Sequence, residues 1–232
     1  MTKIDWDMFS EKTKTVDLSR TDITILNWKG CPPDLNGINL SYNKIKEINW
    51  KDCPQSLIGI NLDHNQIKEM NWKGCPPDLK KIYLRYNKIR KIKWKGCPQS
   101  LIYAGLSHNK IVEMNWQDCP KGFNEIELGH NYIKEMNWEE CPQGLVWIDL
   151  ENNQIIEMNW KYIPRNLIIL GPKELSDKLD EYKKNRDNNQ SLSYPCIVND
   201  NICIMKTFPA LQIKCEFENP HNKDIISRYF DK

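Results

Sequence analysis

Apolar residues recur along this chain at a fixed spacing of 22 positions. In the second repeat the apolar positions are Leu35, Ile38, Leu40, Ile45 and Ile48. Residues two apart on an extended backbone point to the same side, so Ile38 and Leu40 face a core while Asn39 faces solvent. Each repeat therefore predicts one short strand, and the strands of successive repeats are expected to stack as a parallel sheet.

Tryptophan follows the same period. Eight of the nine tryptophans lie on it, namely Trp6, Trp28, Trp50, Trp72, Trp94, Trp116, Trp138 and Trp160. Because Trp50 is two residues after the inward-facing Ile48, the pattern predicts a core ladder of indoles about 5 Å apart, the spacing of neighbouring strands. An exposed aromatic ridge for a partner is the alternative. The W-x-x-C-P motif that follows favours an extended return segment, since proline blocks a helix.

Two further columns complete the pattern L-x-x-L-x-L-x-x-N-x-L. They are the leucines Leu40, Leu62, Leu84, Leu106, Leu128 and Leu150, and the asparagines Asn43, Asn65, Asn87, Asn109, Asn131 and Asn153. An asparagine side chain has a donor and an acceptor for backbone groups that a turn leaves unpaired, so this column is expected to be structural.

On these motifs the chain resembles the leucine-rich repeat family over roughly residues 4 to 170. The resemblance implies an α/β-type repeat solenoid with little helix. Such a solenoid is right-handed and curved, with a parallel β-sheet on its concave face and an extended or irregular convex side. The composition, rich in lysine, asparagine and isoleucine, together with W-x-x-C-P, also resembles the leucine-rich repeat proteins predicted in giant DNA viruses of amoebae.

Domain boundaries follow from where the columns fail. Residues 1–14 are predicted to be an N-terminal cap, a partial repeat, and residues 15–172 a solenoid of about seven 22-residue repeats. Leu167 and Leu170 are expected to keep the register, and Pro172 stands where the next leucine should be. Residues 173–190 are predicted to form a charged helix and linker, and residues 191–232 a small C-terminal cap.

The side chains expected on the concave face vary from coil to coil, unlike the core. The predicted partner-binding residues on this face are Lys81, Tyr83, Arg85, Tyr103, Glu127, Trp147 and Asp149. Trp147 is the one tryptophan outside the 22-residue period. Exposed aromatics with arginine are the residue types that anchor protein interfaces, so this surface is the leading candidate site.

The position before each asparagine forms a second candidate surface, a rim. Its predicted residues are Tyr42, His64, Tyr86, His108 and His130. We interpret this rim as a hydrated recognition edge. A metal or proton-transfer site at the neighbouring His108 and His130 is the alternative.

Nine cysteines make complete pairing impossible, and six of them share one column. The segment from Met1 to Lys14 is charged rather than apolar, which predicts an intracellular, cytoplasmic protein whose cysteines are reduced and buried. No C-x-x-C pair, phosphate-cradling glycine loop or membrane-length apolar run is present. The sequence therefore predicts no catalytic residues, no metal, no cofactor and no membrane association.

The net charge is +2, but the residues from Leu79 to Val112 contain no acid, whereas acids dominate from Phe123 to Asn159. Such a gradient orients a charged partner or lets solenoids associate head to tail, and its acidic part disfavours nucleic acid. The leading hypothesis is a non-enzymatic protein–protein interaction module that binds its partner on the concave face. The alternatives are a substrate-recognition arm of a larger, ubiquitin-ligase-type assembly and a structural, self-assembling component.

Overall fold

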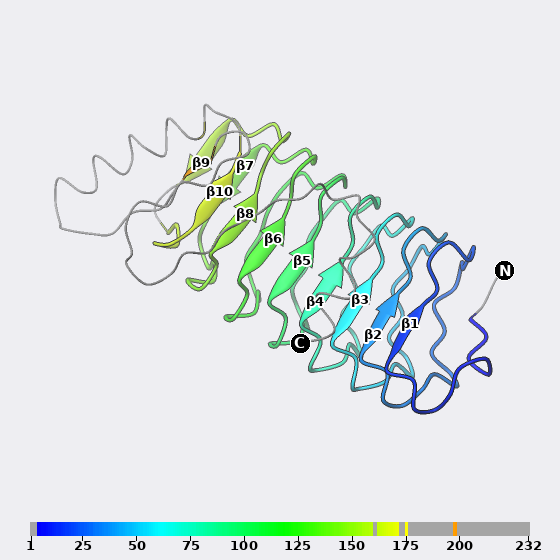
Figure 1. Cartoon of the computed structure of the whole chain (residues 1–232). Helices are drawn as coiled ribbons and strands as arrows, with labels where there is room; N and C mark the ends of the chain where they lie inside the picture. The colour runs from blue at the N-terminus through cyan, green and yellow to red at the C-terminus, as the bar shows by residue number, and fades with distance from the viewer. Residues whose placement is uncertain (1–3, 160–161, 172–174, 176–196, 199–232) are drawn as a thin grey trace.

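One short strand from each repeat contributes to a single parallel sheet. The computed structural model describes residues 4–159 and 162–171, together with Leu175 and the backbone of residues 197–198. The sheet contains, in order, β1 (Thr15–Asp17), β2 (Gly37–Asn39), β3 (Gly59–Asn61), β4 (Lys81–Tyr83), β5 (Tyr103–Gly105), β6 (Glu125–Glu127), β8 (Trp147–Asp149), β10 (Ile168–Leu170) and β11 (Ile197–Val198). The coils lie side by side in chain order, with the return segments behind the sheet (Figure 1).

The middle residue of each of the first eight strands of this sheet, β1 to β6, β8 and β10, faces the core and is aliphatic. These residues are Val16, Ile38, Ile60, Ile82, Ala104, Ile126, Ile148 and Ile169, and none is more than 5% exposed. Their neighbours on each strand point away from the core, as the alternation of a strand requires. The expected parallel solenoid is confirmed, and within the described part of the chain helix is found only at Leu175.

The last coil is one residue shorter than the others. Ile148 pairs with Ile169, 21 positions later, whereas each earlier pair is 22 positions apart. The expectation that Leu170 keeps the inward register is therefore wrong: Leu170 pairs with Asp149 and is half-buried, while Ile169 fills the core position. A slip of one residue moves a side chain to the opposite face of a strand, which explains the exchange.

The return segments on the far side are largely irregular. In two coils they become regular enough to pair, as β7 (Glu135–Asn137) and β9 (Glu157–Asn159), which form a separate parallel two-stranded sheet. None of the helices in the described residues is long and apolar enough to cross a membrane. Most of the predicted linker at 173–190 and cap at 191–232 lies outside the described residues.

The tryptophan ladder lies in the core, as the pattern predicts. The seven indoles from Trp6 to Trp138 are at most 4% exposed, and stacked neighbours have ring centroids 6.1 to 6.4 Å apart. This separation exceeds the spacing of the strands and lies in the range that offset stacking prefers. The Nε1 atom of Trp28 donates to the carbonyl of Asn49 in the next coil at 2.7 Å, and the same bond recurs along the ladder. The alternative of an exposed ridge is wrong for these seven residues.

The asparagine ladder joins each coil to the preceding coil through hydrogen bonds to its backbone. Asn87 Nδ2 donates to the carbonyls of Leu62 and Leu84 at 2.9 and 3.1 Å, and its Oδ1 accepts the amide hydrogen of Ile67 at 2.9 Å. The same bonds recur at Asn65, Asn109 and the later asparagines. The column is structural, because these buried backbone groups have no partner in the sheet.

Candidate partner-binding face

The seven predicted concave-face residues all lie on the outward side of the sheet. Lys81 and Tyr83 belong to β4, Tyr103 to β5, Glu127 to β6, and Trp147 and Asp149 to β8. Arg85 follows β4 by two residues, so its side chain points the same way. The structure brings these residues onto one surface, and their role in binding a partner stays a prediction.

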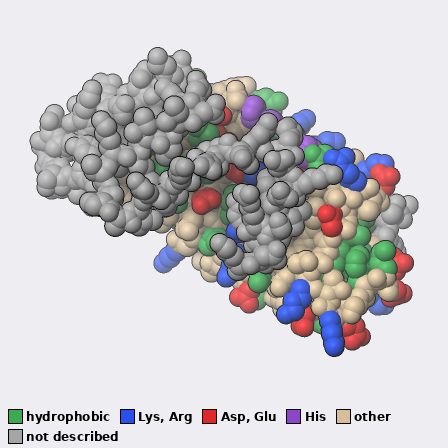
Figure 2. All heavy atoms as spheres, in the orientation of Figure 1, with side chains coloured by type: hydrophobic (Ala, Val, Ile, Leu, Met, Phe, Trp, Pro, Cys, Tyr) green, Lys and Arg blue, Asp and Glu red, His purple; other side chains and the backbone are tan. Residues whose placement is uncertain are grey.

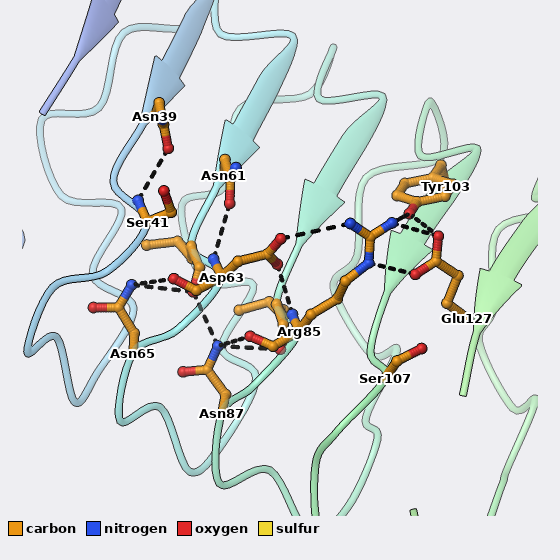
Figure 3. A network of polar contacts seen from close by, with 12 residues as sticks. Asn39, Ser41, Asn61, Asp63, Asn65, Arg85, Asn87, Tyr103, Ser107 and Glu127 are labelled. Atoms are coloured by element: carbon orange, nitrogen blue, oxygen red, sulfur yellow. Dashed lines mark hydrogen bonds and ion pairs between the residues drawn. The ribbon is translucent and has the colours of Figure 1, made fainter. Parts of the chain in front are cut away.

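Arg85 is the centre of a polar network that includes residues from four coils (Figure 3). Its guanidinium donates to both carboxylate oxygens of Glu127 through Nε and Nη2. Tyr103 Oη donates to Glu127 and accepts from Arg85 Nη2 at 2.8 Å. Asp63 accepts the main-chain amide hydrogen of Arg85 at 2.7 Å, and Asp63 Oδ2 lies 3.6 Å from Arg85 Nη1. Two acids thus neutralise Arg85, which joins coils rather than offering a free positive charge.

Gly105 makes room for this network. A Cβ at this position would lie 3.0 Å from Tyr103 Oη and 3.3 Å from Arg85 Nε. Other coils carry Asn39, Tyr83 or Glu127 in the same column. A glycine there lets the Arg85 side chain pass over β5 to reach Glu127, two coils further on. The corresponding signal in the sequence is a glycine in the coil that lies between the coil of an arginine and the coil of a glutamate on the same face.

The part of the face formed by β6 and β8 is acidic. It contains Glu125, Glu127, Asp149 and, just beyond β8, Glu151. Burial, and then the charges of Glu151 and Glu127, raise the pKa of Asp149 to about 7. Burial also raises the pKa of Glu125, against the opposing effect of Lys81. Negative charge is crowded on this surface, with the half-buried ring of Trp147 beside it.

The predicted rim forms one continuous stack of rings. The residues Tyr42, His64, Tyr86, His108 and His130 have successive ring centroids 4.0 to 4.1 Å apart and planes within 11° of parallel. Arg20 covers one end, with its Cζ 4.0 Å from the centroid of the Tyr42 ring. Asn152 closes the other, with its Nδ2 3.2 Å from His130 Nε2. Histidines gather along one edge of the molecule in Figure 2.

All five residues of this rim have a left-handed backbone, with φ between 54° and 57°. Ring faces are covered by neighbouring rings, so the rim presents ring edges. Burial, and then the charge of His130, lower the pKa of His108 and favour its neutral form. Stacked, nearly parallel imidazoles direct their nitrogen lone pairs side by side rather than toward one metal ion. Within the described residues no cluster of three or more potential metal ligands occurs.

Solved structures resemble this architecture. The leucine-rich repeat domain of a Shigella effector gives a TM-score of 0.59 at 18% identity, covering 80% of this chain and 80% of that domain. TLR13 in its complex with ssRNA13 gives 0.60 at 18% identity, covering 81% of this chain and 26% of that chain. This chain has the leucine-rich repeat fold.

YopM from Yersinia enterocolitica gives a TM-score of 0.50 at 27% identity, covering 60% of this chain and 29% of YopM. The chain thus spans less than a third of the length of YopM and of TLR13. No model of a known protein family and no curated protein matches the sequence. The resemblance to leucine-rich repeats is confirmed for the fold, and the resemblance to viral proteins stays a prediction.

Six cysteines follow the leucine-rich repeat period and are free thiols: Cys31, Cys53, Cys75, Cys97, Cys119 and Cys141. Burial raises the pKa of the Cys31 and Cys75 thiols to about 12 and those of the other four still further. These groups remain protonated at neutral pH, which opposes both nucleophilic attack and metal ligation by the column.

The crowded carboxylate of Asp149 gives a prediction about pH. Its raised pKa means that folding favours its protonated form, so the free energy of unfolding falls as pH rises from about 4 to about 7. Asp149→Asn removes this titration and keeps the acceptor for the amide of Glu151, as Asn39 does for Ser41. We expect the variant to be more stable by about 4 kcal/mol near pH 8 and nearly equal near pH 4.

Urea unfolding of both proteins at the two pH values measures this difference. A gain in the free energy of unfolding that is equal at pH 4 and pH 8 would show that titration of the Asp149 carboxylate does not cause the gain.

Proposed function

We propose that this chain is a non-enzymatic protein-binding module whose concave face receives a basic segment of a partner protein. The observation that carries the proposal is the cluster of acids on β6 and β8, where Asp149 lies near Glu127 and Glu151, and where Glu125 is paired opposite Trp147. Of the cations on the same face, Arg85 is engaged by Glu127 and Asp63. A partner that brings lysine or arginine would relieve this crowding.

Trp147 supplies the apolar part of the proposed site. Its side chain is half-buried beside Asp149, and large rings that become fully buried on binding contribute most of the energy at protein interfaces. The acidic side chains steer a basic partner and set its orientation, while the ring anchors it. Together these residues provide the two contributions that a stable protein complex needs.

The leucine-rich repeat fold supports a binding role without selecting the ligand. The similar structures include the domain of a Shigella effector and a TLR13 complex whose ligand is an RNA. The negative charge on β6 and β8 favours a protein partner here, because it repels a phosphate backbone. The free, protonated thiols fit a reducing, intracellular compartment, which we propose as the place where the module acts.

A variant of the proposed anchor tests this function. After capture and identification of a partner from host-cell lysate, Trp147→Ala is expected to weaken its binding by about 30-fold, equivalent to about 2 kcal/mol. Tyr132→Ala is the matched control, since Tyr132 is an exposed aromatic residue away from the strands of the sheet. Isothermal titration calorimetry with the purified partner measures both.

Equal weakening by the two variants, or none by Trp147→Ala, would refute a site at β8. A captured protein that proves to be a second copy of this chain would favour self-assembly, and capture of ligase components would favour a substrate-recognition arm.

A further inference from the structure

The return side of the fourth coil carries a basic groove that is separate from the concave face. The groove has a volume of about 520 Å³ and lies between the asparagine turns and the tryptophan ladder. Its lining includes six cations from three neighbouring coils, namely Lys68, Lys88, Arg90, Lys91, Lys93 and Lys110. All six side chains are exposed.

Most of these cations form no ion pair within the described part of the chain. Lys91 pairs with Glu113 at 3.2 Å. Among the residues that the structure describes, none of the other five forms an ion pair with an acid. Like charges gathered in one groove repel one another, and an anion placed among them removes that repulsion.

The repeat itself shows that the fold does not require these charges. Lys93 occupies a column that holds asparagine in six other coils: Asn27, Asn49, Asn71, Asn115, Asn137 and Asn159. In five of them the side-chain oxygen accepts the amide hydrogen two residues on, at 2.8 to 3.3 Å. A lysine has no acceptor, so the fourth coil loses this turn-stabilising bond and gains a positive charge. A local loss of stability that adds a charge to a groove is typical of a functional site.

The extent of the positive charge points to a compact ligand. Three coils spaced about 4.8 Å apart span about 10 Å along the solenoid. The column of Lys91 holds glutamate in the coils on both sides, at Glu47, Glu69, Glu113 and Glu135, and Glu69 lines the groove itself. A phosphate chain running along the solenoid would meet these acids, whereas a compact anion fits between them.

We propose that this groove binds a compact polyanion that carries several phosphate groups on a small scaffold. Lys88, Arg90 and Lys93 in the fourth coil, with Lys68 and Lys110 from its neighbours, contact the phosphates through charge-assisted hydrogen bonds. The groove is independent of the proposed protein-binding face, because its lining includes none of the sheet residues.

Inorganic tripolyphosphate, titrated into the intact chain by calorimetry at about 150 mM salt, is the probe. The site variant combines Lys88→Gln and Lys93→Asn, the residues that other coils carry at Gln66 and Asn71. The control combines Lys29→Gln and Lys51→Gln, which removes the same charge from the column where Gln117 stands. We expect one site in the unaltered chain, a loss of at least about tenfold for the site variant, and less than about twofold for the control.

Equal losses in the two variants, or no binding by the unaltered chain, would overturn the proposal. So would tighter binding of a thymidine oligonucleotide of about twenty nucleotides, which would assign the groove to nucleic acid. Lys93→Asn alone is expected to raise the melting temperature by about 2 °C while weakening tripolyphosphate binding, because the turn bond returns. A lower melting temperature would show that Lys93 serves the fold instead.

Discussion

Replacing Trp94 by alanine is expected to lower the free energy of unfolding by about 4 kcal/mol. The Trp94 indole is 2% exposed and stacks on Trp72 with ring centroids 6.4 Å apart. The centroid of the Phe123 ring lies 5.1 Å from that of Trp94. Its Nε1 donates to the carbonyl of Asn115 at 2.9 Å, so the variant also leaves a carbonyl of the next coil without its partner. The cavity lies in the fourth coil, where it interrupts the contact between the two halves of the array.

Chemical denaturation followed by circular dichroism measures this effect. Trp94→Phe retains a ring but loses the hydrogen bond, and we expect it to lose about half as much stability. A free energy of unfolding for Trp94→Ala within about 1 kcal/mol of that of the unaltered chain would show that the tryptophan ladder does not form the core.

Asn87→Ala is expected to lower the free energy of unfolding by about 3 kcal/mol. The asparagine is buried, and the alanine leaves the amide hydrogen of Ile67 without its acceptor and removes a donor from the carbonyls of Leu62 and Leu84, which lie in neighbouring coils. Buried backbone groups that lose their hydrogen bonds cannot recover them from water, so each one adds to the loss.

Asn115→Ala provides the matched control in the same solenoid. Asn115 is exposed, and its side chain accepts one hydrogen bond, from the amide of Gln117 at 2.8 Å, so we expect a loss of less than about 1 kcal/mol. Thermal unfolding of both variants compares a buried asparagine with an exposed one. Similar melting temperatures would contradict the structural role of the asparagine ladder.

The sequence predicts those parts of the fold that every coil repeats. A column such as that of Trp50 or Asn65 has the same environment in each repeat, so the period alone determines which side chains face the core. The shorter last coil escaped prediction because Leu170 and Ile169 are both aliphatic. Only the pairing of β10 with β8 shows which of the two residues faces inward.

The candidate site was predicted as a surface but not as a set of interactions. The columns place Arg85, Tyr103 and Glu127 on one face, yet they cannot show that Arg85 reaches two coils along to Glu127. That contact requires a residue without a side chain at Gly105. A search of the concave face for large residues does not detect such a position. Arg85 was therefore expected to be available to a partner, and the structure shows it in an ion pair.

The rim was identified from the sequence, but its stacking was not. The five rim residues share a left-handed backbone, which directs every ring of the column the same way. Neighbouring ring centroids are therefore no more than 4.1 Å apart. Left-handed φ values are uncommon for tyrosine, so propensity alone gives no sign of this geometry. The repeat period again explains why one turn conformation recurs in every coil.

The most direct test of the proposed function is hydrogen–deuterium exchange of the chain with and without its captured partner. Slower exchange confined to peptides that cover β6 and β8, residues 125–127 and 147–149, is the expected result. The face of these strands carries Trp147 and the crowded carboxylates. Protection restricted to residues 88–93 or to residues beyond 171, with β6 and β8 unchanged, would contradict a binding site on the concave face.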